Sequence, residues 1–298
     1  MHALPALGCS ANNNLNNITA IIRYEGADQH ALPNSIPFVP SDTNCEDETG
    51  LVPVVPLNVG TFTDEGDSLD ISIIPEGNLV SWNVNASSFF IDYANPTLLL
   101  VDEHNDTFPG SYNVVELKGD QNTVSLLWRE ELIGSGCISS CNLSEYLLLI
   151  TRYLSLHLCA HYQIHLHGHD FLLLASGQGN FTQEVLANAS LINPTRRDVV
   201  TMPASTFGAP TGGFIVIAFP LNNPGNWVLS SIPPQTDRFK LMHCHIAWHV
   251  SEGLAMQFVE RIDAIPGNVG VGQAWTDTCF SWKKYQDTVN PIRDDSGV

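Results

Sequence analysis

Basic residues are scarce in this chain of 298 residues, where 12 lysines and arginines face 31 aspartates and glutamates and the formal net charge is −19. A surface of this sign repels nucleic-acid phosphates and anionic membrane headgroups, so we expect neither as a partner. No apolar run approaches the roughly 18 residues that a membrane-spanning helix needs. The most apolar segment, residues 146–158, is interrupted by Arg152 and His157. We therefore expect no membrane span.

A secretion signal is also lacking, because the N-terminal residues MHALPALGCSANNN have neither a basic start nor a long apolar core. The acidic composition and six N-x-S/T sequons nevertheless favour a secreted glycoprotein. The sequons lie at Asn17, Asn85, Asn105, Asn142, Asn180 and Asn188. Together these observations predict that the natural N-terminus lies outside this sequence.

The seven cysteines are an odd number, so at least one is free, bound to metal or paired with another chain. Cys9 and Cys45 flank the strand-like run ITAIIRYEGA and could close a loop in an oxidising compartment. Zinc sites usually pair cysteines at C-x₂₋₄-C spacing, and the cysteine in the histidine-rich run near residue 244 has no such neighbour. The spacing therefore disfavours a structural zinc site there.

Short β-rich segments separated by turn residues recur from residue 51 onward, which is typical of a β-sandwich or barrel. Among them we interpret SSFFIDY (87–93) and TLLLVD (97–102) as strands, and we expect helices only near the C-terminal end. Residues 131–163 break this rhythm with three cysteines and a leucine-rich centre. An amphipathic helix over 143–158 is one interpretation. We favour a non-native insertion, such as an unspliced intron.

Seven of the eleven histidines fall in two runs, HYQIHLHGHDF at 161–171 and HCHIAWH at 243–249. In a strand over 242–246, His243 and His245 would share one face while Cys244 would point to the other. His249 can turn back to the pocket of Cys244. A cysteine with two histidines and a weak axial donor is the ligand set of a blue-copper site. The axial place falls at Leu254, which cannot coordinate and should raise the reduction potential.

In the other run, His165 and His167 also share a strand face. The two runs together therefore offer imidazoles that could surround a multi-copper cluster. His169 is predicted to lie next to the metal ligands without binding the metal itself, and Asp170 is predicted to orient a ligand imidazole. For His169, a purely structural, hydrogen-bonded histidine is the stronger alternative.

Five segments of the chain point to a known family: IHLHGHDF, HCHIAWHVSEGLAMQF, IIRYEGAD, NPTRRDVVTMP and the terminal DSGV. Together they resemble the C-terminal cupredoxin domain of a multicopper oxidase. The similarity is to laccases of the ascomycete fungal type, and it covers roughly 15–130 and 164–298. It implies an all-β, cupredoxin-like Greek-key sandwich at 51–265, interrupted by the predicted insertion at 131–163. It also implies that 1–50 is the remnant of a second cupredoxin domain and that 266–298 is a short helical extension with a DSGV tail.

The resemblance further implies copper as the cofactor, phenols and O₂ as partners, and a role for each matching residue. It implies type 1 ligands at Cys244 and His249, with Leu254 at the axial place, a type 2 ligand at His165, type 3 ligands at His167, His243 and His245, and a Cys9–Cys45 disulfide. Trp248 matches a residue that borders the phenol pocket, although packing at the sandwich rim explains it equally well. Cys279 matches a cysteine that bridges to a first domain.

The chain departs from the family pattern in two places. The first-domain H-x-H motifs that complete the family's trinuclear cluster do not occur, so we expect fewer copper ions and impaired activity in this chain alone. The family pattern is also H-P-x-H-x-H, in which the first histidine lies three residues before the second. Here Tyr162 stands three residues before His165. His161, four before, falls on the wrong strand face for a type 1 ligand unless a β-bulge restores it. A standalone copper or electron-transfer protein and a non-catalytic secreted β-sandwich module are the alternatives.

Overall fold

The computed structural model describes residues 19–34, 47, 50–60, 67–76, 79–119, 124–131, 162–203, 212–224, 240–265 and 273–289. The chain divides into two compact units, Met1–Gly50 and Leu51–Val298. Most of the predicted insertion, residues 132–161, and the predicted Cys9–Cys45 disulfide lie outside the described residues. Both stay predictions, as does the assignment of each unit to a cupredoxin domain.

Within the first unit, residues 19–34 follow an exposed path of turns. The Ala27 amide donates to the Tyr24 carbonyl at 3.1 Å, and the His30 amide donates to a carboxylate oxygen of Asp28 at 2.8 Å. The strand-like run predicted here forms no strand over its described residues.

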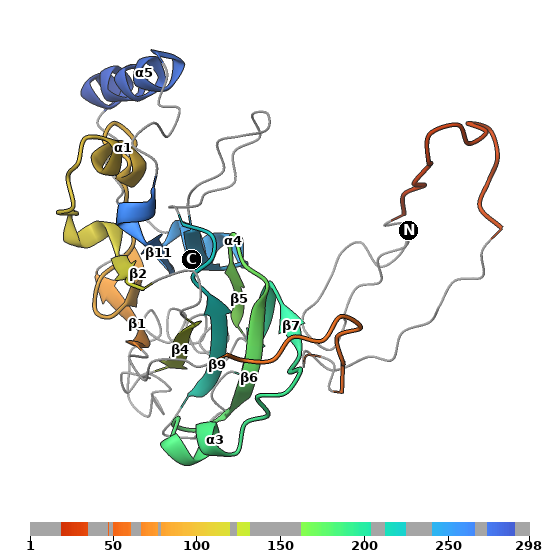
Figure 1. Ribbon diagram of the computed structural model, residues 1–298. Helices are drawn as coiled ribbons and strands as arrows, with labels where there is room; N and C mark the ends of the chain where they lie inside the picture. Colours follow the sequence, from red (N-terminus) through yellow and green to blue (C-terminus); the bar gives the residue numbers. More distant parts are fainter. Residues whose placement is uncertain are drawn as a thin grey trace, which may run out of the picture. The chain divides into compact units, whose positions relative to one another are not determined.

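The second unit contains two β-sheets (Figure 1). The first sheet has the order β2 (Leu79–Val84), β1 (Asp67–Glu76), β4 (Val124–Glu131), β9 (Gly213–Pro220), β6 (Phe171–Gln178) and β7 (Arg196–Arg197). The second has the order β3 (Val114–Leu117), β11 (Ala255–Glu260), β10 (Lys240–Cys244), β5 (Tyr162–Leu166) and β8 (Val199–Met202). The pairs β1–β4 and β3–β11 are parallel and the other pairs antiparallel. The predicted all-β class is therefore confirmed.

The core is built from buried side chains of both sheets. Ile215, Ile217 and Phe219 come from β9, and Ile164, Leu166, Met242 and Phe258 come from β5, β10 and β11. In β5 buried side chains alternate with less buried ones, as expected for a strand with one face on a core. In β9 seven of the eight residues are buried, which is typical of a strand covered on both faces.

The helices are α1 (Thr97–Asp102), α3 (Gln183–Ala187), α4 (Ala247–Ser251) and α5 (Gln273–Val289), with 3₁₀ turns η1 (Gly110–Tyr112) and η2 (Ile262–Ala264). Helix α5 confirms the predicted C-terminal helix. The expectation that helices occur only near that end was wrong. No helix among the described residues is long and apolar enough to cross a membrane.

Two segments predicted as strands are not strands. Residues 97–102 form α1 because Pro96 starts the turn with its carbonyl, and because Leu98 and Val101, three residues apart, bury one helical stripe. A short apolar run does not distinguish this stripe from a buried strand. Residues 87–93 stay irregular, and the Asp92 amide donates to the Tyr112 hydroxyl at 3.2 Å.

Candidate metal centre

Strands β5 and β10 are antiparallel neighbours that carry the two histidine runs. His243 lies opposite His165, and Cys244 lies opposite Ile164. Because residues directly opposite each other share a sheet face, the register separates two sets of side chains. Cys244 and Ile164 are fully buried, whereas His165 is partly exposed.

We name the two sets by their chemistry. The imidazole face carries His165, His167, His243 and His245, and the thiol face carries Tyr162, Cys244, His249 and Leu254.

The rings of the imidazole face lie close together. Ring centroids are 4.5 Å apart for His165–His167, 5.1 Å for His167–His243 and 5.4 Å for His243–His245. The Nε2 atoms of His167 and His243 are 3.0 Å apart. The structure therefore brings together the four histidines that the two strands were predicted to present on one face.

Backbone carbonyls determine the tautomers of two of these imidazoles. His165 Nδ1 lies 2.6 Å from the carbonyl oxygen of Asp198, and His243 Nδ1 lies 2.8 Å from that of Cys244. A carbonyl oxygen only accepts, so each Nδ1 carries the proton and each neutral ring keeps its lone pair on Nε2. Both rings are thus prepared to bind a metal through Nε2.

Burial keeps the central imidazoles neutral. Desolvation, followed by the neighbouring imidazoles, lowers the pKa of His167 from 6.5 to about 4. Desolvation also lowers the pKa of His243, against the opposing effect of its hydrogen bond to the Cys244 carbonyl. Near neutral pH these rings are uncharged, which is the state that binds metals.

The imidazole face is not a closed metal site. Among the described residues, no group of three or more His, Cys, Asp or Glu side chains is arranged to hold a metal ion. The donor chemistry, four clustered imidazoles with two fixed tautomers, nevertheless suits copper.

A buried network supports the turn that follows β5. His169 Nε2 is 2.8 Å from one carboxylate oxygen of Glu260, whose other oxygen accepts a hydrogen bond from the Asn223 amide at 2.8 Å. The Asn223 side-chain amide donates to the Gly168 carbonyl at 2.9 Å. This network joins the turn bearing His167 to the ends of β9 and β11. It supports the structural alternative for His169.

The role of Asp170 in orienting a ligand imidazole stays a prediction, and Asp198, which the sequence did not single out, contacts His165. Asp170 is exposed, and its side chain makes no hydrogen bond or ion pair with any described residue. The backbone of Asp198, immediately before β8, is instead the partner of His165. Sequence reasoning missed it because a backbone acceptor carries no residue-type signal.

A short helix places His249 on the thiol face. Its amide donates to the Ile246 carbonyl at 3.0 Å in the first turn of α4, and its carbonyl accepts from the Leu254 amide at 2.9 Å. The Cys244 amide in turn donates to the Leu254 carbonyl at 3.3 Å. Cys244 Sγ lies 3.3 Å from His249 Nδ1, and the side chains of these two residues and of Leu254 are fully buried.

Tyr162 occupies the position of β5 where the family pattern has a type 1 histidine. It is fully buried, with its ring centroid 5.4 Å from that of Trp82 and 5.5 Å from that of His249. His161 lies outside the described residues. Trp248 packs on His249 with centroids 4.1 Å apart, which supports a packing role, and its role in a phenol pocket stays a prediction.

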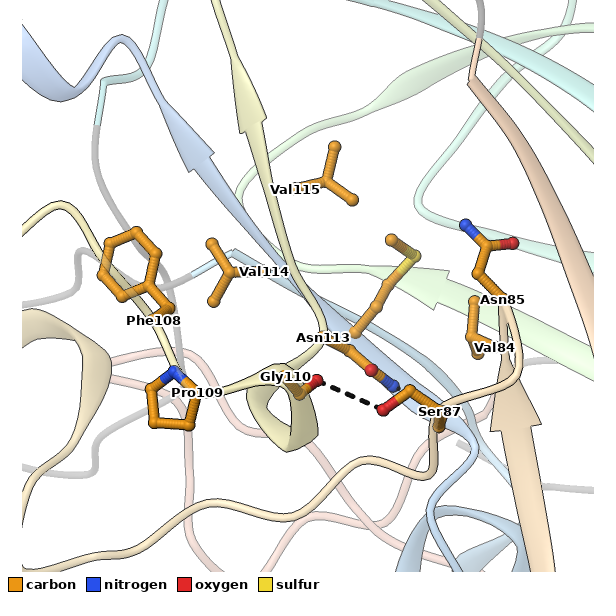
Figure 2. Close-up of a pocket in the computed structure, with 10 residues that line it drawn as sticks. Val84, Asn85, Ser87, Phe108, Pro109, Gly110, Asn113, Val114 and Val115 are labelled. Carbon is orange, nitrogen blue, oxygen red and sulfur yellow. Dashed lines mark hydrogen bonds between the residues drawn. The ribbon is translucent and has the colours of Figure 1, made fainter.

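A separate cavity of about 330 Å³ lies between the end of β2, η1 and β3 (Figure 2). Its lining is apolar or amide in character, with Phe108, Val114, Met256, Asn85 and Asn113 among its residues. A hydrogen bond from the Ser87 hydroxyl to the Gly110 carbonyl, 3.1 Å long, lies at its edge. No imidazole or thiol lines it, so it is not part of the candidate metal centre.

Comparison with known proteins identifies similar chains. A family model described as multicopper oxidase matches residues 160–264, which include the whole of both histidine runs. Laccase-1 of Botryotinia fuckeliana is 36% identical over 294 residues, which are 97% of this chain and 43% of that protein. Dihydrogeodin oxidase of Aspergillus terreus is 31% identical over 95% of this chain and 45% of its own length. The chain thus spans less than half the length of these relatives.

Solved structures agree with this result. The laccase of Botrytis aclada has a TM-score of 0.67 and 34% identity, over 98% of this chain and 46% of that one. Fet3p, a multicopper oxidase described as functioning in iron import, has a TM-score of 0.55 at 18% identity, over 86% of this chain and 43% of its own, and supports the fold alone. The predicted cupredoxin-like fold class is confirmed.

Proposed function

The chain belongs to the multicopper oxidase family, and we propose that it acts as the C-terminal, imidazole-donating portion of a laccase-type oxidase. The observation that carries this proposal is the gathering of four imidazoles on one face of β5 and β10. Copper held there supplies the family's chemistry, the reduction of O₂ to water coupled to one-electron oxidation of phenols. Under this proposal His165 is a type 2 ligand, and His167, His243 and His245 are type 3 ligands.

The residues around the imidazoles prepare them for this role. The carbonyls of Asp198 and Cys244 hold protons on Nδ1, and burial keeps His167 and His243 neutral. The Glu260–His169 contact steadies the turn that bears His167. These features reduce the reorganisation that metal binding requires.

We propose that the remaining donors come from a first cupredoxin domain and that the chain alone is impaired. The support is that the described imidazoles do not close a metal site among themselves. O₂ and phenols are the proposed small-molecule partners of the assembled site.

We also propose that the protein is secreted and glycosylated. Four sequon asparagines lie in the described residues, at Asn85, Asn105, Asn180 and Asn188, and all four are exposed. Exposure is what attachment of a glycan requires.

Copper binding by the full chain tests the proposal. We expect bound copper, measured by elemental analysis after removal of excess metal, and loss of the share held by the imidazole face in the His167→Ala/His243→Ala double variant. His30→Ala, an exposed histidine outside both runs, is the matched control and should retain wild-type copper. A chain that binds no copper would contradict the proposal. Oxygen uptake with a phenol by the chain alone would contradict the proposed impairment.

A further inference from the structure

The thiol face does not fit the type 1 copper that family membership implies. That centre needs a cysteine and two histidines in a trigonal arrangement, with a weak axial donor. Here Cys244 and His249 are in contact, with Sγ and Nδ1 3.3 Å apart, but Leu254 offers only hydrocarbon at the axial place. No second imidazole reaches this face from the described residues, where Tyr162 occupies the remaining position.

The place of Tyr162 is set by strand register. Cys244 lies opposite Ile164, and Tyr162 lies two residues from Ile164 on the same buried face. Its ring packs edge-on against Trp82, and Trp82 in turn lies 4.4 Å from the His249 ring between centroids. Among the described residues, the rings that pack beside His249 therefore include those of Tyr162 and Trp82, and no second imidazole does.

We propose that Cys244 and His249 form a two-donor site for Cu(I), and that Tyr162, in place of the second imidazole, prevents formation of a blue copper(II) centre. A thiolate donor selects soft Cu(I), whereas copper(II) prefers additional nitrogen or oxygen donors in a tetragonal set. The buried, largely apolar surroundings also favour the ion of lower charge. The inference rests on the proposed copper chemistry of the chain, but it does not require O₂ reduction.

Spectroscopy of the full chain tests this inference. Wild type, Tyr162→His, Tyr162→Phe and Cys244→Ser would be loaded with Cu(I) without oxygen, freed of excess metal and analysed for copper content. Each sample would then be treated with a strong one-electron oxidant, hexachloroiridate(IV), and examined by visible absorption and electron paramagnetic resonance. An absorption band from cysteine sulfur to copper(II) belongs to the thiol face where Cys244→Ser abolishes it, because the chain contains six other cysteines.

We expect wild type and Tyr162→Phe to bind one more equivalent of Cu(I) than Cys244→Ser and to show no blue band after oxidation. Tyr162→His should gain an intense blue band, because it restores the cysteine and two-histidine set. If Tyr162→His does not fold, a blue band in wild type still tests the inference, and the copper content of wild type against Cys244→Ser still tests the Cu(I) site.

A blue band in wild type would overturn the inference while leaving the proposed function intact. A copper(II) band that Tyr162→Phe abolishes would also overturn it, by making Tyr162 a ligand. Equal copper content in wild type and Cys244→Ser would overturn the Cu(I) site itself. Absence of copper from every sample would instead count against the proposed function.

Discussion

The imidazole face and the thiol face are opposite sides of the same two strands, yet they differ in how far they match a copper enzyme. On the imidazole face, the four histidines that the family pattern places in this domain are present, and five of their six ring pairs have centroids 4.5–5.7 Å apart. On the thiol face, Tyr162 stands where the pattern has a histidine. One substitution in a strand can therefore change one face without altering the residues of the other, because alternate residues face opposite ways.

The two faces also differ in packing. The first prediction, which has the largest expected effect, measures this difference through the free energy of unfolding. Tyr162 is fully buried in the core, so Tyr162→Ala should lower the free energy of unfolding by about 4 kcal/mol. His245 is exposed, so His245→Ala should change it by no more than about 0.5 kcal/mol in the metal-free chain. Urea denaturation of both variants provides the measurement. Similar losses in the two variants would show that the faces do not differ in packing.

A second prediction concerns the buried support of the imidazole face. Glu260→Ala removes the carboxylate that contacts His169 and the Asn223 amide, and should cost about 3 kcal/mol of unfolding free energy. Glu116→Ala is the matched control, because the Glu116 carboxylate meets only the exposed Lys118 ammonium at 3.5 Å, and it should cost less than about 1 kcal/mol. If Glu260→Ala lowers the unfolding free energy by no more than Glu116→Ala does, the result would contradict a structural role for the network.

A third prediction tests the turn that brings Leu254 and His249 to the thiol face. Gly253 has φ of +101°, and an added Cβ would overlap Ser88 Oγ and lie 2.9 Å from the Trp82 carbonyl oxygen. Gly253→Ala should therefore cost about 2–3 kcal/mol through strain and close contact.

Gly179→Ala separates these two causes. Gly179 has φ of +90° with nothing within 4 Å of an added Cβ, so only strain of about 1 kcal/mol is expected. Thermal denaturation of both variants measures the difference. Equal shifts in Tm would mean that the close approach of Trp82 and Ser88 contributes nothing.

The last prediction is a pH dependence that arises on the imidazole face of the metal-free chain. Burial lowers the pKa of His167 in the folded state to about 4, from the 6.5 of an ordinary histidine. The unfolded chain therefore binds the proton more readily, and stability falls as pH decreases from 6.5 toward 4 and is unaffected above that window. His167→Asn should reduce this slope, measured by urea denaturation with a chelator present. An unchanged slope would assign the effect to other groups.

Much of the site was predictable because strand alternation is local. The runs HLH and HCH place imidazoles on one face and Cys244 on the other once the segments are strands, and the offset of three from His165 correctly placed Tyr162 on the thiol side. The short helix at 97–102 was not predictable in this way, because its apolar residues fit either a strand or a helix.

By itself, the sequence determined the all-β class, the C-terminal helix and the residue types on each face, since these follow from composition and from periods of two and of 3.6 residues. Only the tertiary structure decided which partners the side chains meet. The carbonyl of Asp198 fixes the tautomer of His165, and Glu260 contacts His169. Trp82 packs against both Tyr162 and His249. These partners lie 33, 91 and 80 residues away along the chain, and no local pattern specifies contacts over such separations.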